Sequence, residues 1–466
     1  MYPRLKECLV RGAGDEFFLQ NYATGEDWAL DDKLQAEILH ACDGGLGLME
    51  IAQKTEQFHE DVLSFLRVFQ ENDLLEFLQN PEAVKFPALQ KDPAIQDIQL
   101  EVTSKCNLRC LHCYGRREFF KIEKEEISTE RVIELIGQMR DLNVALLTLS
   151  GGETFLRKDL PEIIRCIANH RIRLNGIFTN ATLYRQEVID AIKDSAIKPT
   201  LLVSLDGHDS ASHDYIRGDG NFDKSIAFIK KVISQGLRVT VNTVVMKNNV
   251  FHLEEMRNFL RDLGVSRWRI SIPREQGEAI VNSDQIMPDL QDIFSAYKRL
   301  LIKTIENPKG MRIQLSSIFK SEFLDTGQYT LFCDKTSCCQ YKRWSLTVSS
   351  NGNVLTCPST FQTPLGNILE TNLSDIWYSN LVQAFKSIPL CQTECADCEI
   401  RAYCGGGCRM MARSKTGNLF GRDENACPLY HFFFKEILPI FESVGIKGVT
   451  LKESECAYDT SILNSV

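Results

Sequence analysis

CNLRCLHC, residues 106–113, places Cys106, Cys110 and Cys113 at positions i, i+4 and i+7. These thiols come shortly after an apolar run at residues 98–102 that predicts a buried strand. Three thiolates can hold three corners of an iron–sulfur cubane, which leaves the fourth iron open to a small chelating ligand. Structural zinc usually takes four ligands in two paired knuckles, so the spacing favours an open [4Fe–4S] cluster over zinc.

Outward from these thiols, short apolar runs alternate with amphipathic segments whose period is helical. The runs lie at 98–102, 145–149, 172–178, 200–205, 238–245 and 267–272, and the segments include 129–142 and 223–235. Six βα units predict an α/β fold with a parallel, right-handed, barrel-like sheet. Active sites of such sheets lie at the carboxyl ends of the strands, so the residues after each run are the candidates.

The spacing CxxxCxxC after the first strand resembles the signature of the radical S-adenosylmethionine (SAM) superfamily, and the resemblance covers residues 98–272. It implies a partial (β/α)6 radical SAM barrel. It also implies that SAM chelates the open iron and that an electron from the cluster splits SAM to give a 5′-deoxyadenosyl radical. The protein would position this cofactor and exclude water.

The same resemblance assigns residues at further strand ends to the SAM pocket. SGGE, residues 150–153, resembles the family motif for the methionine amine, because Gly151 and Gly152 allow close backbone approach and Glu153 can accept hydrogen bonds from an ammonium group. Ser204 in VSLDG and Arg217 in HDYIRG resemble contacts to the ribose and to the methionine carboxylate.

Asn242, Thr179 and Asn180 also follow predicted strands and are expected to line this pocket. Capping of the strand ends is the alternative role for these polar residues. The sequence does not identify a catalytic general base.

A second group of thiols follows residue 330, with the spacing Cys339-x12-Gly352-x4-Cys357, then Cys395-x2-Cys398-x5-Cys404-x3-Cys408, then Cys427. The spacing alone predicts a multi-thiolate metal region, with zinc as an alternative. We expect metal rather than a large apolar core to hold this region together.

This spacing resembles the SPASM extension of radical SAM peptide-modifying enzymes, which carries two auxiliary [4Fe–4S] clusters. The resemblance implies one cluster on Cys333, Cys339, Cys357 and Cys408, and another on Cys395, Cys398, Cys404 and Cys427. Cys338 is an alternative to Cys339. The cysteines without partners at ligand spacing are expected to be buried thiols, namely Cys8, Cys42, Cys166, Cys391 and Cys456.

The first 80 residues form a winged-helix-like unit that resembles the RiPP recognition element, a small peptide-binding domain. FFLQNYATGEDWALDD, ACDGG and DLLEFL carry the resemblance. It implies that an exposed strand edge takes the leader of a precursor peptide as an added strand. A winged helix could instead bind DNA or dock on the barrel, but the unit has no basic recognition helix.

The expected domains are 1–80 as the recognition element, 81–97 as a linker that contains Pro81, Pro87 and Pro93, 98–320 as the barrel, 321–440 as the SPASM domain, and 441–466 as a tail. Three prolines among mixed polar residues disfavour regular structure in the linker.

Composition and charge argue against some classes of function. The 466 residues have ordinary hydrophobic and charged fractions, a net charge of −9 and scattered basic residues, which argue against nucleic acid or membrane as the main partner. The start MYPRLKECLV resembles no export signal, so a cytoplasmic location is expected. Seventeen cysteines in such a chain are expected to bind metal rather than to form disulfides.

These resemblances together imply an enzyme that uses SAM and three [4Fe–4S] clusters to modify a ribosomal precursor peptide, with flavodoxin or ferredoxin as the electron donor. A thioether cross-link from a cysteine, as in sactipeptide and ranthipeptide synthases, is the main expectation. Carbon–carbon cross-linking, oxidative or decarboxylating maturation is the enzyme alternative. An iron–sulfur redox sensor is the alternative of another class, although a sensor needs no SAM pocket.

Overall fold

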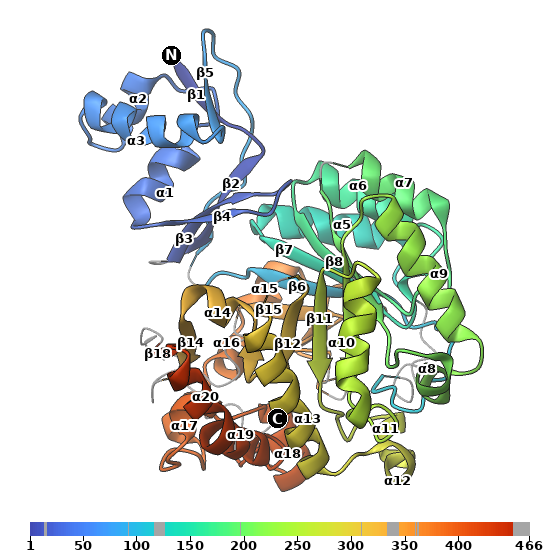
Figure 1. Ribbon diagram of the computed structural model, residues 1–466. Coiled ribbons are helices and arrows are strands. Elements are labelled where there is room, and N and C mark those ends of the chain that lie inside the picture. The colour runs from blue at the N-terminus through green and yellow to red at the C-terminus, as the bar shows by residue number, and fades with distance from the viewer. Residues whose placement is uncertain are drawn as a thin grey trace.

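The computed structural model describes residues 1–450 except 14–15, 92, 116–125, 196, 309, 333–343, 359 and 361–362. A small N-terminal unit, coloured blue, lies above a larger α/β body (Figure 1). None of the helices in the described ranges is long and apolar enough to cross a membrane.

The α/β body is built on six consecutive parallel strands. They are β6 (Asp97–Thr103), β7 (Leu146–Gly151), β8 (Arg173–Thr179), β9 (Thr200–Ser204), β10 (Val239–Val244) and β11 (Arg267–Ser271). Each strand pairs in parallel with the next one along the chain. The six strands predicted from the apolar runs are confirmed, and their carboxyl ends lie along one edge of the sheet.

Further strands extend the sheet at both sides. Beyond β11 lie β12 (Arg312–Leu315), which is parallel, and β13 (Phe319–Lys320), which is antiparallel. Beyond β6 lie β15 (Ser345–Val348), which is parallel, and β16 (Asn353–Leu355) and β17 (Gly366–Asn367), which are antiparallel. The sheet is therefore mixed, and a strand from the C-terminal region lies directly beside the first strand of the predicted barrel.

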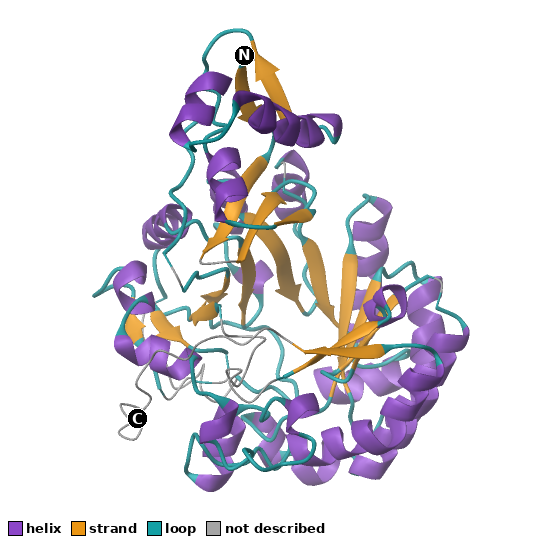
Figure 2. Ribbon diagram, turned by 90° about the vertical axis from the view of Figure 1, so that its left-hand side faces the viewer, coloured by secondary structure: helices purple, strands orange, loops and turns teal. Residues whose placement is uncertain are grey.

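Amphipathic helices cover one face of this sheet (Figures 1 and 2). They include α5 (Thr129–Asp141), α6 (Leu160–Asn169), α7 (Gln186–Asp194), α9 (Asn221–Ser234), α10 (Leu253–Asp262) and α13 (Leu290–Glu306), while α8 (Ser210–Arg217), α11 (Glu278–Val281) and α12 (Ser283–Ile286) lie near the carboxyl ends of the strands. Short η segments are η1 (Thr154–Leu156) and η2 (Val250–His252). Ile98, Leu100 and Val102 of β6 pack with the buried faces of these helices. We call the opposite face of the sheet the inner face.

The C-terminal region shares the apolar core of the barrel. Its elements are α14 (Glu322–Thr326), β14 (Gln328–Leu331), α15 (Leu373–Trp377), α16 (Asn380–Lys386), η4 (Leu390–Gln392), α17 (Arg401–Cys404), α18 (Arg409–Thr416), α19 (Ala426–Phe432), η5 (Phe433–Ile437), α20 (Leu438–Ser443) and β18 (Lys447–Thr450). Leu346, Trp377 and Phe441 are buried in the same cluster as the barrel strands. The expectation that this region lacks a large apolar core is therefore wrong.

The N-terminal unit has a core of its own. Its elements are β1 (Tyr2–Leu5), β2 (Cys8–Ala13), β3 (Glu16–Asn21), β4 (Asp27–Leu30), α1 (Lys33–His40), α2 (Leu48–Lys54), α3 (His59–Glu71) and β5 (Leu75–Leu78). β2, β3 and β4 form an antiparallel sheet, and β1 pairs with β5. Leu19, Leu39 and Leu66 are fully buried in this separate core.

Polar contacts join this unit to the barrel. The buried Arg11 side chain on β2 bonds to the Asn143 side chain and donates to the Arg171 carbonyl at 2.9 Å. Asn143 in turn donates to the Val10 carbonyl at 2.8 Å. Asn143 and Arg171 both have positive φ in the turns that precede β7 and β8. These contacts fix the unit against the amino ends of those strands.

Residues 79–96 contain no helix or strand in their described part, as expected for the linker. The segment is nevertheless packed at both ends. Phe86 and Leu89 contact the core of the N-terminal unit. Further along, the Trp377 indole donates to the Pro93 carbonyl at 2.8 Å, and Ile95 is buried in the barrel core.

Candidate functional site

The loop 106–113 is held in place by contacts from two other elements. Leu111 donates its N–H to the Ile216 carbonyl of α8 at 3.0 Å. The Cys113 carbonyl accepts from Glu278 N–H at 2.9 Å, and the Asn282 side chain donates to the Leu111 carbonyl. The three thiols therefore sit on a fixed loop at the carboxyl end of β6.

Burial disfavours the thiolate form of these cysteines when no metal is bound. It raises the pKa of Cys110 to about 12, against the opposing effect of the nearby Arg217 guanidinium. It also raises the pKa of Cys106, whose Sγ accepts the Leu108 N–H. Metal binding must therefore release protons from this loop. Three thiols on one loop fit a [4Fe–4S] cluster with one open iron.

The SGGE turn lies against the backbone that leads into the cysteine loop. Gly152 donates its N–H to the Thr103 carbonyl at 2.8 Å, and Glu153 donates to the Lys105 carbonyl at 2.7 Å. A Cβ atom at Gly151 or Gly152 would lie 2.2 Å from a carbonyl oxygen of this backbone. The sequence predicted that these glycines allow the backbone to approach a ligand closely. In the structure they lie against the backbone that follows β6, and this contact holds the ends of β6 and β7 together.

Glu153 is buried and organises the neighbouring strand end. Its carboxylate accepts the Thr179 hydroxyl at 2.8 Å, the Asn180 N–H at 2.6 Å and the Phe155 N–H at 3.0 Å. Burial raises the pKa of Glu153, and these hydrogen bonds oppose that rise. The Asn180 amide also donates to the Asn107 side chain at 3.0 Å. The structure therefore brings Glu153, Thr179 and Asn180 together beside the cysteine loop.

Arg217 lies against the cysteine loop. Its Nε donates to the Asp206 carboxylate at 2.6 Å, and its Nη atoms lie 3.9 Å from Cys110 Sγ and 3.4 Å from His112 Nε2. Asp206 is fully buried, and although burial opposes it, Arg217 and His112 lower the pKa of this carboxyl. Sequence reasoning missed the anchoring role of Asp206, because nothing in VSLDG indicates its partner on α8.

Ser204 and Asn242 complete a row of predicted residues along the carboxyl ends of the strands. They are in register with each other on β9 and β10, and Thr179 of β8 is in register with Val203. The amide nitrogen of Asn242 is buried and has no hydrogen-bond partner in the described part of the chain. Such an orphaned donor is suited to an incoming polar ligand.

Four C-terminal cysteines lie near one another. Burial raises the pKa of Cys404, and the thiolates of Cys427 and Cys395 raise it further. The pKa of Cys427 is likewise raised by burial and then by Cys395 and Cys398. No three metal-binding side chains in the described ranges converge on the single point that a zinc ion requires.

Cys408 and Cys357 form a second, separate neighbourhood. Burial raises the pKa of Cys408, and the Cys357 thiolate adds to that rise. Gly405, Gly406 and Gly407 all have positive φ, which shapes the turn that leads into Cys408. The other two cysteines predicted to join this pair, Cys333 and Cys339, lie outside the described residues, as does the alternative Cys338.

The cysteines expected to be buried differ from one another. Cys8 and Cys42 are buried, as predicted, and Cys166 is half-buried. Cys391 is exposed, so that prediction is wrong, because it lies on η4 at the surface. Cys456 lies outside the described residues.

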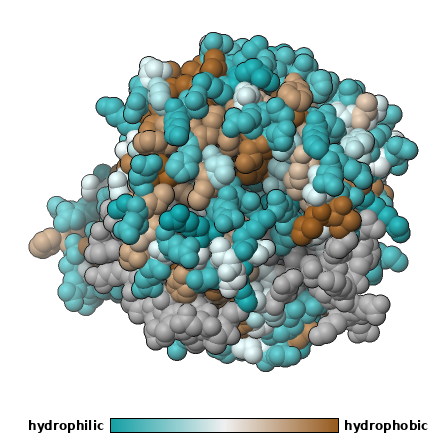
Figure 3. All heavy atoms as spheres, turned by 90° about the horizontal axis from the view of Figure 1, so that it is seen from below, coloured by the Kyte–Doolittle hydropathy of each residue, from teal (hydrophilic) through white to brown (hydrophobic). Residues whose placement is uncertain are grey.

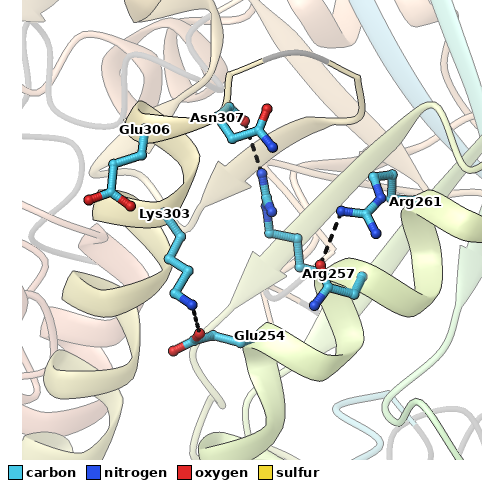
Figure 4. A pocket seen from close by; sticks show the side chains of 7 residues that line it. Glu254, Arg257, Arg261, Lys303, Glu306 and Asn307 are labelled. Carbon is cyan, nitrogen blue, oxygen red and sulfur yellow. Dashed lines mark hydrogen bonds and ion pairs between the residues drawn. The ribbon is translucent and has the colours of Figure 1, made fainter.

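The face seen from below and one surface pocket are less suited to bind a cofactor than the cysteine loop. Seen from below, it is mostly hydrophilic with scattered apolar side chains (Figure 3). A pocket of about 250 Å³ between α10 and α13 is lined by ion-paired side chains such as Glu254 and Lys303, 2.9 Å apart (Figure 4). Among its other lining residues, Arg257 donates to the Asn307 carbonyl at 3.0 Å and Arg261 donates to the Asn258 side chain at 3.2 Å.

Comparison with known proteins agrees with this geometry. Residues 100–260 match the Radical SAM superfamily model, and residues 338–399 match the SPASM iron–sulfur cluster-binding domain. The chain therefore carries a radical SAM domain and a SPASM domain, which imply SAM and [4Fe–4S] clusters as cofactors.

Individual relatives and structures are similar over most of the chain. The AdoMet-dependent heme synthase of Methanosarcina barkeri is 27% identical over 338 residues, which cover 69% of this chain and 93% of the synthase. The PqqA peptide cyclase of Streptomyces rochei is 26% identical over 72% of this chain and 91% of the cyclase. The crystal structure of Streptococcus suis SuiB bound to precursor peptide SuiA superposes with a TM-score of 0.68 at 17% identity, over 91% of this chain and 99% of SuiB.

Proposed function

We propose that this chain, with its radical SAM and SPASM domains, modifies a ribosomal precursor peptide by forming thioether cross-links from cysteine. The observation that carries the choice of a precursor peptide as substrate is the likeness to SuiB over 91% of the chain. The remainder is about 42 of the 466 residues, fewer than the N-terminal unit contains, so the likeness in fold must extend into that unit. SuiB itself was crystallised with its precursor peptide.

In this proposal the N-terminal unit, residues 1–80, recognises the leader of the precursor. β4 supports this role because, among the described residues, it pairs only with β3 and leaves its other edge open. Asp27 and Ala29 on β4 are exposed. An added peptide strand would gain affinity from backbone hydrogen bonds and specificity from alternate side chains.

The cofactors are assigned as the sequence predicts. Cys106, Cys110 and Cys113 would hold the SAM-binding cluster, and the pocket residues would be Gly151, Gly152, Glu153, Thr179, Asn180, Ser204, Arg217 and Asn242. The auxiliary clusters would take Cys333, Cys339, Cys357 and Cys408, and Cys395, Cys398, Cys404 and Cys427. The clusters supply one-electron chemistry and SAM supplies the organic radical. Flavodoxin or ferredoxin would deliver the electrons.

A second candidate is a maturase that forms a carbon–carbon bond or oxidises or decarboxylates its substrate. Similarity to the PqqA peptide cyclase favours it, since that name denotes ring closure within a peptide. The thioether and the carbon–carbon bond differ in the fate of the substrate cysteine, because a thioether consumes its thiol whereas a carbon–carbon bond between other residues leaves it free.

Mass spectrometry of a precursor co-expressed with the enzyme separates the two candidates. We expect the product to lose a pair of hydrogens per bond and to resist alkylation at the bonded cysteine after full reduction. The same loss of mass with every cysteine still open to alkylation would contradict the thioether and favour the second candidate. The control is co-expression with the triple variant Cys106→Ala, Cys110→Ala and Cys113→Ala, which should leave the precursor unchanged.

A further inference from the structure

Glu101 is a buried carboxylate with no hydrogen-bond partner among the described residues. It lies on β6, upstream of Cys106, and its side chain is 1% exposed. Neither carboxylate oxygen has a hydrogen-bond partner within the described part of the chain. Burial of a carboxylate without compensation is costly, so an isolated one in a native fold requires an explanation.

The strand pattern points Glu101 toward the inner face of the sheet. Leu100 and Val102, its neighbours in sequence, pack with the helices on the other face. Side chains alternate between faces along a strand, so Glu101 lies on the side away from the helices. It is in register with Ser150 on β7, the first residue of SGGE.

The groups around Glu101 belong to the candidate site. Tyr114 directly follows Cys113, and its pKa is raised first by burial and then by the Glu101 carboxylate. The Cys113 and Cys357 thiols and the Arg274 guanidinium also act on the Tyr114 phenol. Glu101 is therefore close to a residue that lies between the first cysteine loop and a cysteine of the SPASM domain.

Other buried polar atoms on the inner face lack partners too. Asn242 and Arg269 are in register on β10 and β11, and each has a buried nitrogen without a hydrogen-bond partner among the described residues. Their neighbours Val241, Trp268 and Ile270 pack with the helices. An inner face with unpaired donors and an unpaired acceptor suits the binding of a polar substrate segment better than it suits a packed core.

We propose that Glu101 is the catalytic proton acceptor for the precursor cysteine, an assignment that rests on the function proposed above. The S–H proton passes to the Glu101 carboxylate, which becomes a carboxylic acid, and the cysteine becomes a thiolate. Only a proton is transferred in this step, and no oxidation state changes. The thiolate is the reactive form of cysteine, so the step prepares the sulfur for bond formation.

The acidity of the two groups supports this transfer. Burial raises the pKa of Glu101 to about 8. The thiol of an unperturbed cysteine has a pKa of about 8.5, so the proton moves between groups of similar acidity at little cost in free energy. Burial is the cause of the rise in the pKa of Glu101, and the Glu101 carboxylate in turn acts on the Tyr114 phenol, together with Cys113, Arg274 and Cys357.

The test compares reconstituted full-length enzymes by the ratio of thioether product to 5′-deoxyadenosine. Glu101→Gln keeps the size of the side chain but removes the base, and we expect the ratio to fall about 100-fold. In the wild-type enzyme the ratio should rise as the pH increases through about 8, and Glu101→Gln should lose this rise. Glu101→Asp retains a carboxylate and should keep the rise with about a tenfold lower ratio.

Glu254→Gln is the matched control, because Glu254 forms ion pairs on the outer side of the helices, and this variant should behave as wild type. Infrared spectroscopy gives a readout without turnover. The carbonyl stretch of a protonated, buried carboxyl should be present near pH 6, disappear as the pH rises through about 8, and be missing in Glu101→Gln.

The outcomes separate this inference from the proposed function. If Glu101→Gln forms thioether at the wild-type ratio with the same pH dependence, Glu101 is not the proton acceptor and the proposed function stands. If the infrared band survives in Glu101→Gln, the buried acid is another residue and the assignment is wrong. If the wild-type product contains no thioether, the proposed function fails together with the thiol as proton donor, whatever the infrared titration of Glu101 shows.

Discussion

Glu153 in the SGGE turn and Glu101 on the adjacent strand β6 are both buried, yet their carboxylates have opposite surroundings. Glu153 accepts three hydrogen bonds from Thr179, Asn180 and Phe155, and these bonds connect the ends of β7 and β8. Glu101 accepts none in the described chain. The first carboxylate therefore contributes to the architecture of the site, whereas the burial of the second is not compensated by hydrogen bonds within the described residues.

This difference predicts how stability depends on pH. The pKa of Glu101 is raised to about 8, above the value of about 4.3 in an unfolded chain, so the native state holds a proton that the unfolded state releases between these values. Stability should therefore fall as the pH rises across this window. Glu101→Gln should remove the loss and add on the order of 3 kcal/mol to the free energy of unfolding at pH 8, with far less effect near pH 4. Urea unfolding at the two pH values measures this, and an equal effect at both would contradict it.

Contacts between side chains of different elements could not be predicted from the sequence. The Asp206–Arg217 ion pair and the Arg11–Asn143 contact join residues from different elements, and neither appears in local periodicity. Glu101 belongs to a run that reads as an ordinary strand, and only the fold shows that its carboxylate has no partner. Glu153 and the cysteines could be singled out as candidates because those residues form compact motifs.

The strands and the cysteine loop are the elements that the sequence predicted best. Buried parallel strands produce continuous apolar runs, which is why β6 to β11 could be placed from composition alone. The packing of the C-terminal region could not be predicted, because its buried residues, such as Leu346 and Trp377, are dispersed among turns. Their partners are supplied by the barrel rather than by their own neighbours in sequence.

The turn at Gly152 predicts a sharp effect on the neighbouring loop. In Gly152→Ala, the new Cβ atom would lie 2.2 Å from the Lys105 carbonyl oxygen, directly before Cys106, so the backbone must shift. We expect the variant to lose most of the iron bound by the first loop and to release about tenfold less 5′-deoxyadenosine. Gly137→Ala on α5 is the control, because nothing lies within 4 Å of its Cβ position and alanine favours a helix. Equal iron content and activity in both variants would show that the close approach is unimportant.

Cys357 and Cys404 should belong to different auxiliary clusters, since the first neighbours Cys408 and the second neighbours Cys427. Replacement of either by alanine should lower the ratio of peptide product to 5′-deoxyadenosine by about 100-fold, because electron removal follows the radical step. Each variant should also contain about four fewer irons than the wild type. Zinc at about two per chain in the wild-type protein would contradict the cluster assignment.

At the scale of the whole molecule, the two largest apolar cores of the described residues are joined by a packed linker. One core contains residues from Leu5 to Leu75, and the other extends from Ile95 to Ile446. The barrel and the C-terminal region should therefore unfold together, whereas the N-terminal unit can unfold separately. This arrangement suits a leader-binding unit that delivers a peptide to a rigid site.

Removal of the N-terminal unit tests that division. Leu89 of the linker packs on the N-terminal unit, whereas the next residue, Gln90, bonds to Ile95 of the barrel. A chain that begins at Gln90 should therefore keep its SAM cleavage within about twofold, while modification of the full precursor falls about 100-fold through loss of effective concentration. Rates of 5′-deoxyadenosine release and of product formation measure the two effects. Modification at the full-length rate would show that the unit does not recognise the leader.

Transfer of deuterium from the precursor to 5′-deoxyadenosine tests the central claim most directly, because it links the cysteine loop, SAM and the peptide in one reaction. With a precursor deuterated at the acceptor carbon, we predict that 5′-deoxyadenosine gains deuterium as the cross-linked product forms. The triple variant of Cys106, Cys110 and Cys113 should yield neither. A modified peptide accompanied by 5′-deoxyadenosine without deuterium would contradict the account, because the radical would then not act on that carbon of the peptide.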